Sequence, residues 1–338
     1  MYSGICSPHL VQRGPAMAPC PATCRQRTEK PRKPPLSLRP KRPPHDLRYA
    51  RRTDGNGSNM PHLNANGVEL HYETDSEGYP LVFVHGGFGG VSTSVLPGGS
   101  PIEGAVPDGY CVVTHDRRCA GTSEYTLDWF TLADIAEDTH QLMVALGFEN
   151  YVLVGSSMGG MVAQQLVLTR PGAIAALALM NTGPDLMSHT RWGQAYTATA
   201  ARVRETGDDL EFERVRDRIR NPPEPDADAA KARHAEYLTA LAARSDDELK
   251  LMHSGTVRNY GAFVGYNFSG RLSEIDAPTL IVHGTADTTV PFEDGQTLER
   301  GIRGSEFHAI EGAQHGILGY PAAKAALQGW LSRLSLSR

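Results

Sequence analysis

Short apolar runs alternate with longer amphipathic segments along most of the chain. The runs lie at residues 81–84, 111–114, 151–154, 175–180 and 279–282. Uninterrupted apolar runs that end in glycine or a polar turn are typical of strands buried on both faces of a parallel sheet. Between them, residues 132–143 and 161–169 repeat apolar positions at helical spacing. The alternation predicts an α/β fold with a doubly wound, mostly parallel sheet.

One long segment interrupts this alternation. Residues 185–272 are rich in charged residues and alanine, and the Asn-Pro-Pro-Glu-Pro sequence at 221–225 separates two predicted helical stretches. The strand pattern resumes at Leu280. We therefore interpret 185–272 as a helical insertion in a single core that is built from residues 60–184 and 273–338.

The character of the chain changes near residue 60. Residues 1–59 contain 12 basic and 3 acidic residues and 10 of the 23 prolines. Proline at this density blocks helix and sheet hydrogen bonds, and few apolar residues are present to form a core, so we expect a disordered, basic extension. A dispensable tail, or a natural start at Met60, is the simplest interpretation, and an organelle-targeting segment is the alternative. Folding signals begin directly afterwards, because Asn66-Gly67 between two short mixed runs predicts a β-hairpin.

Charge and cysteine content narrow the class of protein. The formal net charge is −5, and the 279 residues after the extension carry 21 basic and 35 acidic side chains, which gives no reason to expect a nucleic-acid partner. No apolar run reaches the roughly 18 residues that span a bilayer. Only Cys111 and Cys119 lie beyond the extension, which suits a reducing, cytoplasmic compartment. We therefore expect a protein that acts on a small molecule.

Candidate chemistry follows the predicted strands, since ligands of an open parallel sheet gather at the carboxyl ends of its strands. Gly155-Ser156-Ser157-Met158-Gly159 connects a strand to a helix, where small residues permit a tight turn that exposes the Ser157 hydroxyl. Asp287 and His315 follow two later strands. A serine hydroxyl needs a base such as imidazole, and that base needs a carboxylate to orient it. The chain order Ser157, Asp287, His315 therefore predicts a nucleophile, acid and base set, with Asp185 as a second candidate for the acid.

A glycine-rich stretch, His85-Gly86-Gly87-Phe88-Gly89-Gly90, follows the first central strand. A tetrahedral oxyanion needs two N–H donors, and glycine lets the backbone turn an amide toward it. The N–H groups of Gly87 and of Met158 are the expected pair. The spacings of a dinucleotide or phosphate loop are absent from this stretch.

Together these residues resemble the α/β-hydrolase family, in its lid-bearing serine esterase and lactonase group. The elbow around Ser157, the His-Gly-Gly loop, the Asp-x-Arg-x-x-Gly-x-Ser turn at 116–123, the Gly-x-x-Asp loop and the Gly-x-x-His loop match in order. The resemblance implies Ser157 as nucleophile, His315 as base, Asp287 as acid and residues 185–272 as a lid. The family often has glycine where this chain has Cys119, for which we expect a packing role.

The implied reaction is cleavage of a small carboxylic ester or lactone through an acyl-enzyme, with no metal and no organic cofactor. We expect Phe88, Tyr260, Phe263 and Tyr266 to line the substrate pocket, although packing of the insertion onto the core would explain the last three equally well. The same groups could cleave an amide, a peptide or a C–C bond, or catalyse acyl transfer or peracid formation. A non-catalytic receptor of the same fold is the alternative from another class. The sequence does not predict the oligomeric state.

Overall fold

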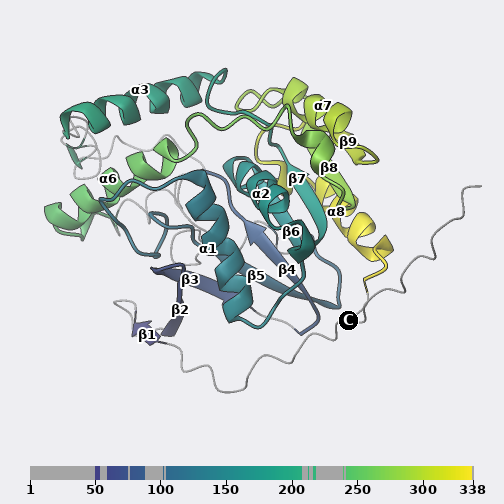
Figure 1. Ribbon diagram of the computed structural model, residues 1–338, viewed down its shortest axis with the longest axis horizontal. Helices are drawn as coiled ribbons and strands as arrows, with labels where there is room; N and C mark the ends of the chain where they lie inside the picture. The colour runs from purple at the N-terminus through teal and green to yellow at the C-terminus, as the bar shows by residue number, and fades with distance from the viewer. Residues whose placement is uncertain are drawn as a thin grey trace, which may run out of the picture. The chain divides into compact units, whose positions relative to one another are not determined.

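The computed structural model describes residues 50–53, 59–74, 77–87, 102, 104–207, 212, 216–217, 239 and 241–336. Within these residues the strands form one nine-stranded sheet in the order β1-β2-β3-β5-β4-β6-β7-β8-β9 (Figure 1). The strands are β1 (Ala50–Thr53), β2 (Asn59–Ala65), β3 (Val68–Thr74), β4 (Tyr79–Val84), β5 (Tyr110–His115), β6 (Tyr151–Ser156), β7 (Ile174–Met180), β8 (Thr279–Gly284) and β9 (Glu306–Ile310). From β5 to β9 every pair is parallel, whereas β1, β2 and β3 join the sheet as antiparallel strands.

Helices cover both faces of the sheet, as the apolar runs predict. The helices are α1 (Leu132–Ala145), α2 (Met158–Thr169), α3 (Arg191–Thr206), α6 (Asp246–Gly261), α7 (Phe292–Gly301) and α8 (Pro321–Arg333). In β4, Val82 and Val84 belong to the core cluster that contains α1 and α2, whereas Leu81 and Phe83 belong to the cluster that contains α8. Successive side chains of a strand point to opposite faces, so a continuous apolar run serves two cores at once. The predicted doubly wound α/β sheet is confirmed.

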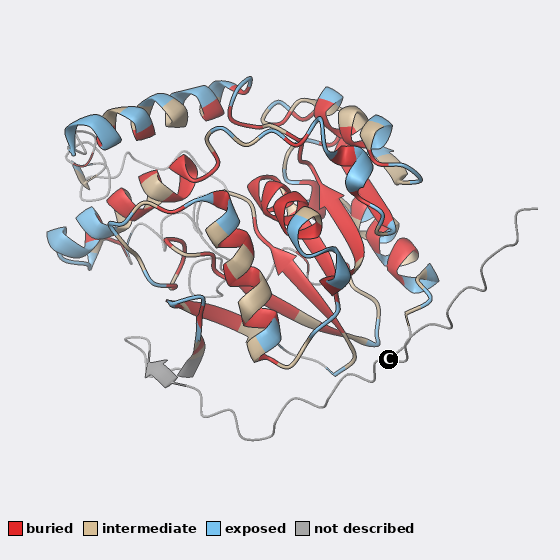
Figure 2. Ribbon diagram, in the orientation of Figure 1, coloured by how far each residue is buried: buried red, intermediate tan, exposed pale blue. Residues whose placement is uncertain are grey.

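Local sequence explains the start and the inward face of α1. The Thr131 side chain accepts a hydrogen bond from the backbone N–H of Asp134, and the Asp134 carboxylate accepts one from the N–H of Thr131. This capping box satisfies backbone donors that the first helical turn leaves without partners. The buried positions Leu132, Ile135 and Leu142 then lie on one side of the helix. Figure 2 shows the contrast with α2, which is buried along most of its length, and α3, which is exposed on its outer side.

The first strands agree with the predicted hairpin and extend it. Asn66 and Gly67 both have positive φ (55° and 81°), as a tight turn between β2 and β3 requires. Of the extension expected over residues 1–59, residues 1–49 and 54–58 lie outside the described residues. Residues 50–53 differ from the expectation, because they form β1, whose backbone groups pair with β2.

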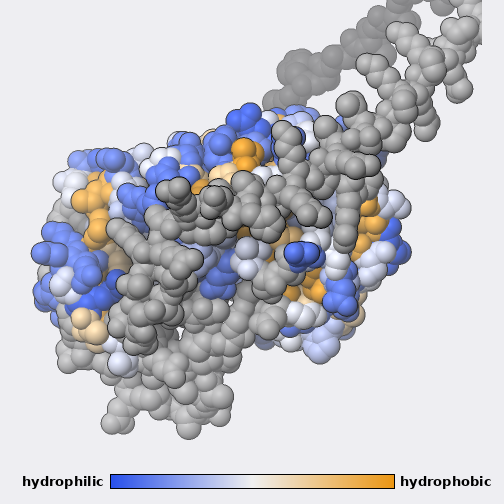
Figure 3. Space-filling model, turned by 90° about the horizontal axis from the view of Figure 1, so that it is seen from below, coloured by the Kyte–Doolittle hydropathy of each residue, from blue (hydrophilic) through white to orange (hydrophobic). Residues whose placement is uncertain are grey.

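Two helices of the segment between β7 and β8 lie side by side. Helices α3 and α6 contact each other and lie toward one end of the sheet (Figure 1). The predicted break at 221–225 lies outside the described residues. The exposed large apolar side chains Leu127, Val144 and Leu251 come from three separate segments. On the face in Figure 3, apolar side chains of the described part likewise form separate groups among hydrophilic ones. Among the described helices, none combines the length and the apolarity that crossing a bilayer requires.

Three buried histidines, His85, His115 and His283, are expected to make the fold sensitive to acid. Burial lowers the pKa of His115 to about 4 and lowers the pKa of His85 and of His283. In the unfolded chain a histidine titrates near 6.5, so below that pH the unfolded state binds protons that the folded state does not. The stability these neutral histidines contribute is therefore present above pH 6.5 and is lost as the pH falls toward 4.

We expect His115 alone to lower the free energy of unfolding by about 3 kcal/mol between pH 7 and pH 4. Urea denaturation across this range measures the change, and His115→Gln should make the dependence on pH shallower. An unaltered pH dependence in that variant would contradict the assignment.

Candidate active site

The predicted site residues meet at the carboxyl edge of the parallel strands. Ser157 follows β6, Asp287 follows β8 and His315 follows β9, while Gly86 and Gly87 follow β4. The strands β4, β6, β7 and β8 are neighbours in the sheet. Loops that are far apart in the sequence are thereby brought to one place.

The turn that carries Ser157 is strained and tightly enclosed. Ser157 has φ 53° and ψ −121°, a conformation that favours glycine. A Cβ on Gly159 would lie 2.1 Å from the carbonyl oxygen of Val84, so α2 approaches β4 backbone to backbone. The Thr182 hydroxyl, at the end of the next strand, donates to the Ser157 carbonyl at 2.7 Å. These contacts hold Ser157 in its strained conformation, directly before the first turn of α2.

Ser157, His315 and Asp287 form a continuous hydrogen-bonded chain. His315 Nε2 lies 2.9 Å from Ser157 Oγ, and His315 Nδ1 lies 2.8 Å from Asp287 Oδ2. An ionised carboxylate only accepts hydrogen bonds, so Nδ1 carries the proton and Nε2 is left to accept from the serine hydroxyl. The Asp287 side chain is fully buried, whereas that of His315 is 29 % exposed.

Asp287 is kept ionised by its hydrogen bonds. Burial opposes ionisation, but the bonds from His315 and from the backbone N–H of Val290 outweigh it and lower the pKa of the Asp287 carboxyl. Its second oxygen, Oδ1, accepts from the N–H groups of Thr289 and Val290 at 2.8 and 2.9 Å. The carboxylate is therefore fixed in orientation and charged at neutral pH.

A second histidine, His283, supports the loop that carries Asp287. His283 Nε2 donates to the Val290 carbonyl at 3.0 Å and lies 3.6 Å from Asp287 Oδ2. His283 is fully buried, and burial lowers its pKa, so it is neutral at neutral pH. His283 lies in β8 directly before the Gly-x-x-Asp sequence, but no sequence pattern assigns it this supporting contact.

Asn181 is a site residue that the sequence pattern does not reveal. It follows β7, is fully buried and has a positive φ of 42°. Its Nδ2 donates to the carbonyl groups of Gln314 and His315 at 3.2 and 2.8 Å, and its Oδ1 accepts from the N–H of Gly284. One amide side chain thus ties the end of β8 to the loop of His315. Its only signal in the sequence is an amide residue directly after a buried strand.

Replacing Asn181 by aspartate should loosen this connection. A carboxylate oxygen would then face the two carbonyl oxygens without a proton to donate, so we expect the free energy of unfolding to fall by about 1–3 kcal/mol. Hydrolysis of an activated ester should slow as well, because the His315 loop loses its fixed position. Asn150→Asp is the matched control, since exposed Asn150 also donates to a backbone carbonyl. Unchanged stability and rate in Asn181→Asp would refute this role.

Two backbone N–H groups are available beside the serine. Met158 begins α2, where the first N–H groups have no helical partner, and neither it nor Gly87 donates a hydrogen bond within the described residues. A Cβ on Gly86 would lie 3.1 Å from Ser157 Cβ, and one on Gly87 would lie 3.2 Å from Met158 Sδ. The predicted pair of N–H groups, from Gly87 and Met158, therefore lies next to the Ser157 hydroxyl. A substrate carbonyl attacked by this hydroxyl would need hydrogen-bond donors at that place.

The predicted pocket residues lie in different places. Tyr260 of α6 is buried, and its hydroxyl would lie 2.5 Å from a Cβ on Gly87, so it borders the site. Phe263 is fully buried beneath the Arg117 guanidinium. Tyr266 is partly buried and contacts the Phe268 ring. Phe88 lies outside the described residues.

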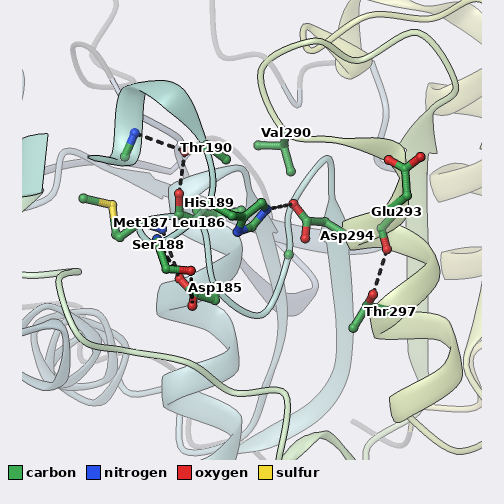
Figure 4. Close-up of polar contacts among 12 residues, drawn as sticks. Asp185, Leu186, Met187, Ser188, His189, Thr190, Val290, Glu293, Asp294 and Thr297 are labelled. Carbon is green, nitrogen blue, oxygen red and sulfur yellow. Dashed lines mark hydrogen bonds and ion pairs between the residues drawn. The ribbon is translucent and has the colours of Figure 1, made fainter. Parts of the chain in front are cut away.

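Two further sequence hypotheses concern Cys119 and Asp185. Cys119 is buried with φ 56°, which explains why glycine would suit this position, and burial raises the pKa of its thiol to about 11. Such a thiol is unreactive at neutral pH, and it packs against Gly255 of α6. Asp185 accepts hydrogen bonds from Met187 and Ser188 within the turn before α3 (Figure 4). It also accepts one from the Asn267 side chain, which follows α6. Both of its oxygens thus accept hydrogen bonds from these residues, whereas His315 Nδ1 is paired with Asp287.

The segment that leads into α3 is also tied to α7. His189 Nε2 lies 2.9 Å from Asp294 Oδ2, and Figure 4 shows this pair joining the turn to the first residues of α7. Among the described residues, no group of three or more His, Cys, Asp or Glu side chains could hold a metal ion.

Comparison with known proteins gives one family. The family model of the alpha/beta hydrolase fold matches residues 79–320. A protein of Agrobacterium fabrum named "Putative carbamate hydrolase RutD" is 26% identical over 254 residues, which cover 74% of this chain and 90% of that protein.

Two solved structures share the fold at low sequence identity. They are the enol-lactonase from Burkholderia xenovorans (TM-score 0.61, 22% identity, 82% of this chain and 100% of that one) and a thermophilic esterase from Thermogutta terrifontis (TM-score 0.61, 23% identity, 81% and 99%).

Proposed function

The chain belongs to the α/β-hydrolase fold family, and on that premise we propose that it is a serine hydrolase that cleaves a small carboxylic ester or lactone. The observation that carries the proposal is the chain of contacts from Ser157 through His315 to Asp287, at 2.9 and 2.8 Å. A buried, ionised carboxylate that orients a histidine toward a strained, glycine-flanked serine is the arrangement that activates a hydroxyl for attack.

In the first half of the reaction, Ser157 Oγ attacks the substrate carbonyl carbon and His315 Nε2 takes the hydroxyl proton. The electron pair of the carbonyl double bond moves to oxygen, and the N–H groups of Gly87 and Met158 stabilise that oxyanion. Asp287 stabilises the imidazolium that forms. When the intermediate collapses, the bond to the leaving alkoxide breaks and His315 returns the proton to it.

In the second half, water replaces the alcohol. His315 removes a proton from the water as it attacks the acyl carbon, and the same two N–H groups stabilise the second oxyanion. Collapse then breaks the bond to Ser157 Oγ, and His315 returns the proton to the serine. The enzyme regains its starting state, and a carboxylic acid is released. Each step uses groups of this chain and water.

We propose that residues 185–272 act as a lid over this site. Support comes from α6, because the Tyr260 hydroxyl lies against Gly87. Tyr260 stacks on Tyr196 of α3 with ring centroids 3.8 Å apart, and Trp192 of α3 contacts it edge-on. Residues of both helices would thus bound the space above the nucleophile and select the substrate.

A carbamate is the second candidate substrate, and the RutD relative favours it. The same serine could attack a carbamate carbonyl, since the electrophilic carbon and the developing oxyanion are alike. Amide or C–C cleavage, acyl transfer, peracid formation and a receptor role are outcomes that experiment can distinguish.

The test is a panel of substrates, each assayed with the wild-type protein and with Ser157→Ala as the control. Hydrolysis rates on p-nitrophenyl esters of graded acyl length are compared with those on lactones, carbamates and amides. The proposal expects the highest kcat/KM on a short ester or a lactone. A receptor would hydrolyse none of them, and a preference for carbamates would assign the second candidate instead.

A further inference from the structure

Arg117 is a buried cation next to the site for which the reaction as described has no use. It follows β5, and only 2 % of its surface is exposed. Among the described residues, no carboxylate forms an ion pair with it, and its Nε and Nη1 have no hydrogen-bond partner. The Phe263 ring faces the guanidinium, 5.3 Å from ring centroid to Cζ. Burial lowers the pKa of Arg117 to about 10, so it remains charged at neutral pH. An unpaired buried charge is costly, which calls for an explanation.

Within the described part of the chain, the guanidinium makes one hydrogen bond, and this bond is to the oxyanion loop. Arg117 Nη2 donates to the Gly86 carbonyl oxygen at 2.8 Å. His85 contacts the same oxygen through Nδ1 at 2.8 Å, while its Nε2 accepts from the backbone N–H of Arg117 at 3.1 Å. Because Nε2 is an acceptor in a neutral ring, the proton of His85 is on Nδ1. The Gly86 oxygen therefore accepts two hydrogen bonds, one of them from a charged donor.

The Gly86 oxygen and the Gly87 N–H belong to the same planar peptide group. All described peptide bonds are trans, so the two groups point in opposite directions. Two donors that fix the oxygen consequently fix the direction of the N–H. Hydrogen bonds to the oxygen also polarise the amide, which makes its N–H a stronger donor. The Gly87 N–H is the group that the proposed mechanism directs at the oxyanion.

The positive charge of Arg117 also stabilises the oxyanion directly. In the resting enzyme Arg117 has no anionic partner among the described residues. The tetrahedral intermediate creates a negative oxygen on the far side of the Gly86–Gly87 peptide. In a site that excludes water, attraction between these charges is stronger than in solvent, and it exists only while the oxyanion exists.

We infer that Arg117 is a positioning residue of the oxyanion hole, which holds and polarises the Gly86–Gly87 peptide and favours the charged intermediate over the bound substrate. The inference rests on the proposed function. It predicts a specific kinetic signature, because a group that acts only on the intermediate changes kcat and leaves KM nearly unchanged.

The test compares Arg117→Met with Arg117→Lys on p-nitrophenyl acetate. Methionine fills a similar volume without charge or donor, so we expect kcat to fall about 10–100-fold with KM within about threefold, less than the loss of a direct donor. Lysine restores the charge and a donor and should recover part of kcat. Arg118→Met is the matched control, since Arg118 is paired with Asp138 and lies over Phe130 instead of Phe263. It should lower the melting temperature while kcat stays within about threefold of wild type.

A sulfur substrate separates this role from simple structural support. In a thionoester the developing charge resides on sulfur, a weak hydrogen-bond acceptor. The hydrogen-bond contribution is thus weak in the thionoester, although its anion still feels the charge, so the ratio of oxoester to thionoester kcat should fall in Arg117→Met. If the methionine variant does not fold, the lysine variant must show a lower ratio than wild type at unchanged KM.

Failure of the Arg117 role and failure of the proposed serine-hydrolase function give different results. Wild-type kcat or a wild-type ratio in the Arg117 variants, beside an inactive Ser157→Ala, would overturn the positioning role alone. A lysine variant no better than methionine would also overturn it. Full turnover in Ser157→Ala would overturn both.

Discussion

Turnover of p-nitrophenyl acetate should fall by about 10⁴–10⁶-fold when Ser157 is replaced by alanine. The substitution removes the only atom that can form the proposed acyl-enzyme and leaves the backbone N–H groups of Gly87 and Met158 in place. Residual catalysis would come from these donors and from binding. The loss should appear in kcat on every hydrolysed substrate, because one nucleophile serves all of them.

Ser156→Ala is the matched control for this variant. Ser156 ends β6 one residue before the nucleophile, and it belongs to the same glycine-flanked sequence. Its hydroxyl has no part in the mechanism, so the rate should stay within about threefold of wild type. If Ser157→Ala retained the wild-type rate on any substrate of the panel, that reaction would need a different nucleophile.

Asp287→Asn should lower kcat by about 10⁴-fold while the fold remains intact. An amide has nearly the same shape, but it loses the negative charge that orients His315 with its proton on Nδ1 and stabilises the imidazolium. With the other tautomer, His315 Nε2 could no longer accept the serine proton. Steady-state kinetics and a thermal melt of the same preparation separate lost chemistry from lost structure.

Asp185→Asn tests the competing assignment of the acid. Asp185 accepts hydrogen bonds from Met187 and Ser188 in the turn before α3, and from Asn267, which follows α6. Its replacement should therefore affect the stability of that turn and leave kcat within about threefold of wild type. Equal losses in the two variants, or a larger loss in Asp185→Asn, would contradict Asp287 as the acid.

Features that depend on neighbouring residues could be predicted from the sequence. The continuous apolar runs predict strands with two buried faces, and Asn66-Gly67 predicts the turn between β2 and β3. The glycines around Ser157 are also predictable in physical terms. Gly159 has no space for a Cβ next to β4, and a strained strand-to-helix turn needs such residues.

Features that depend on distant partners could not be predicted. Asn181 bonds to residues more than 130 positions away, and Arg117 reaches Gly86 across 31 positions. Nothing local distinguishes either residue from an ordinary polar residue after a strand. Strand β1 could not be predicted for a different reason, because the basic, proline-rich composition of residues 1–59 indicates disorder and β1 covers four residues. A single sequence shows which side chains are available for a site, but which of them come into contact depends on the fold.

The most direct test of the central claim is to trap the acyl-enzyme. The protein is mixed rapidly with excess p-nitrophenyl acetate, quenched in acid, digested and analysed by mass spectrometry. We predict a burst of p-nitrophenolate equal to the enzyme concentration and an acetyl group on Ser157, both absent from Ser157→Ala. Hydrolysis with no acetyl group on Ser157, together with a wild-type rate in Ser157→Ala, would contradict the claim.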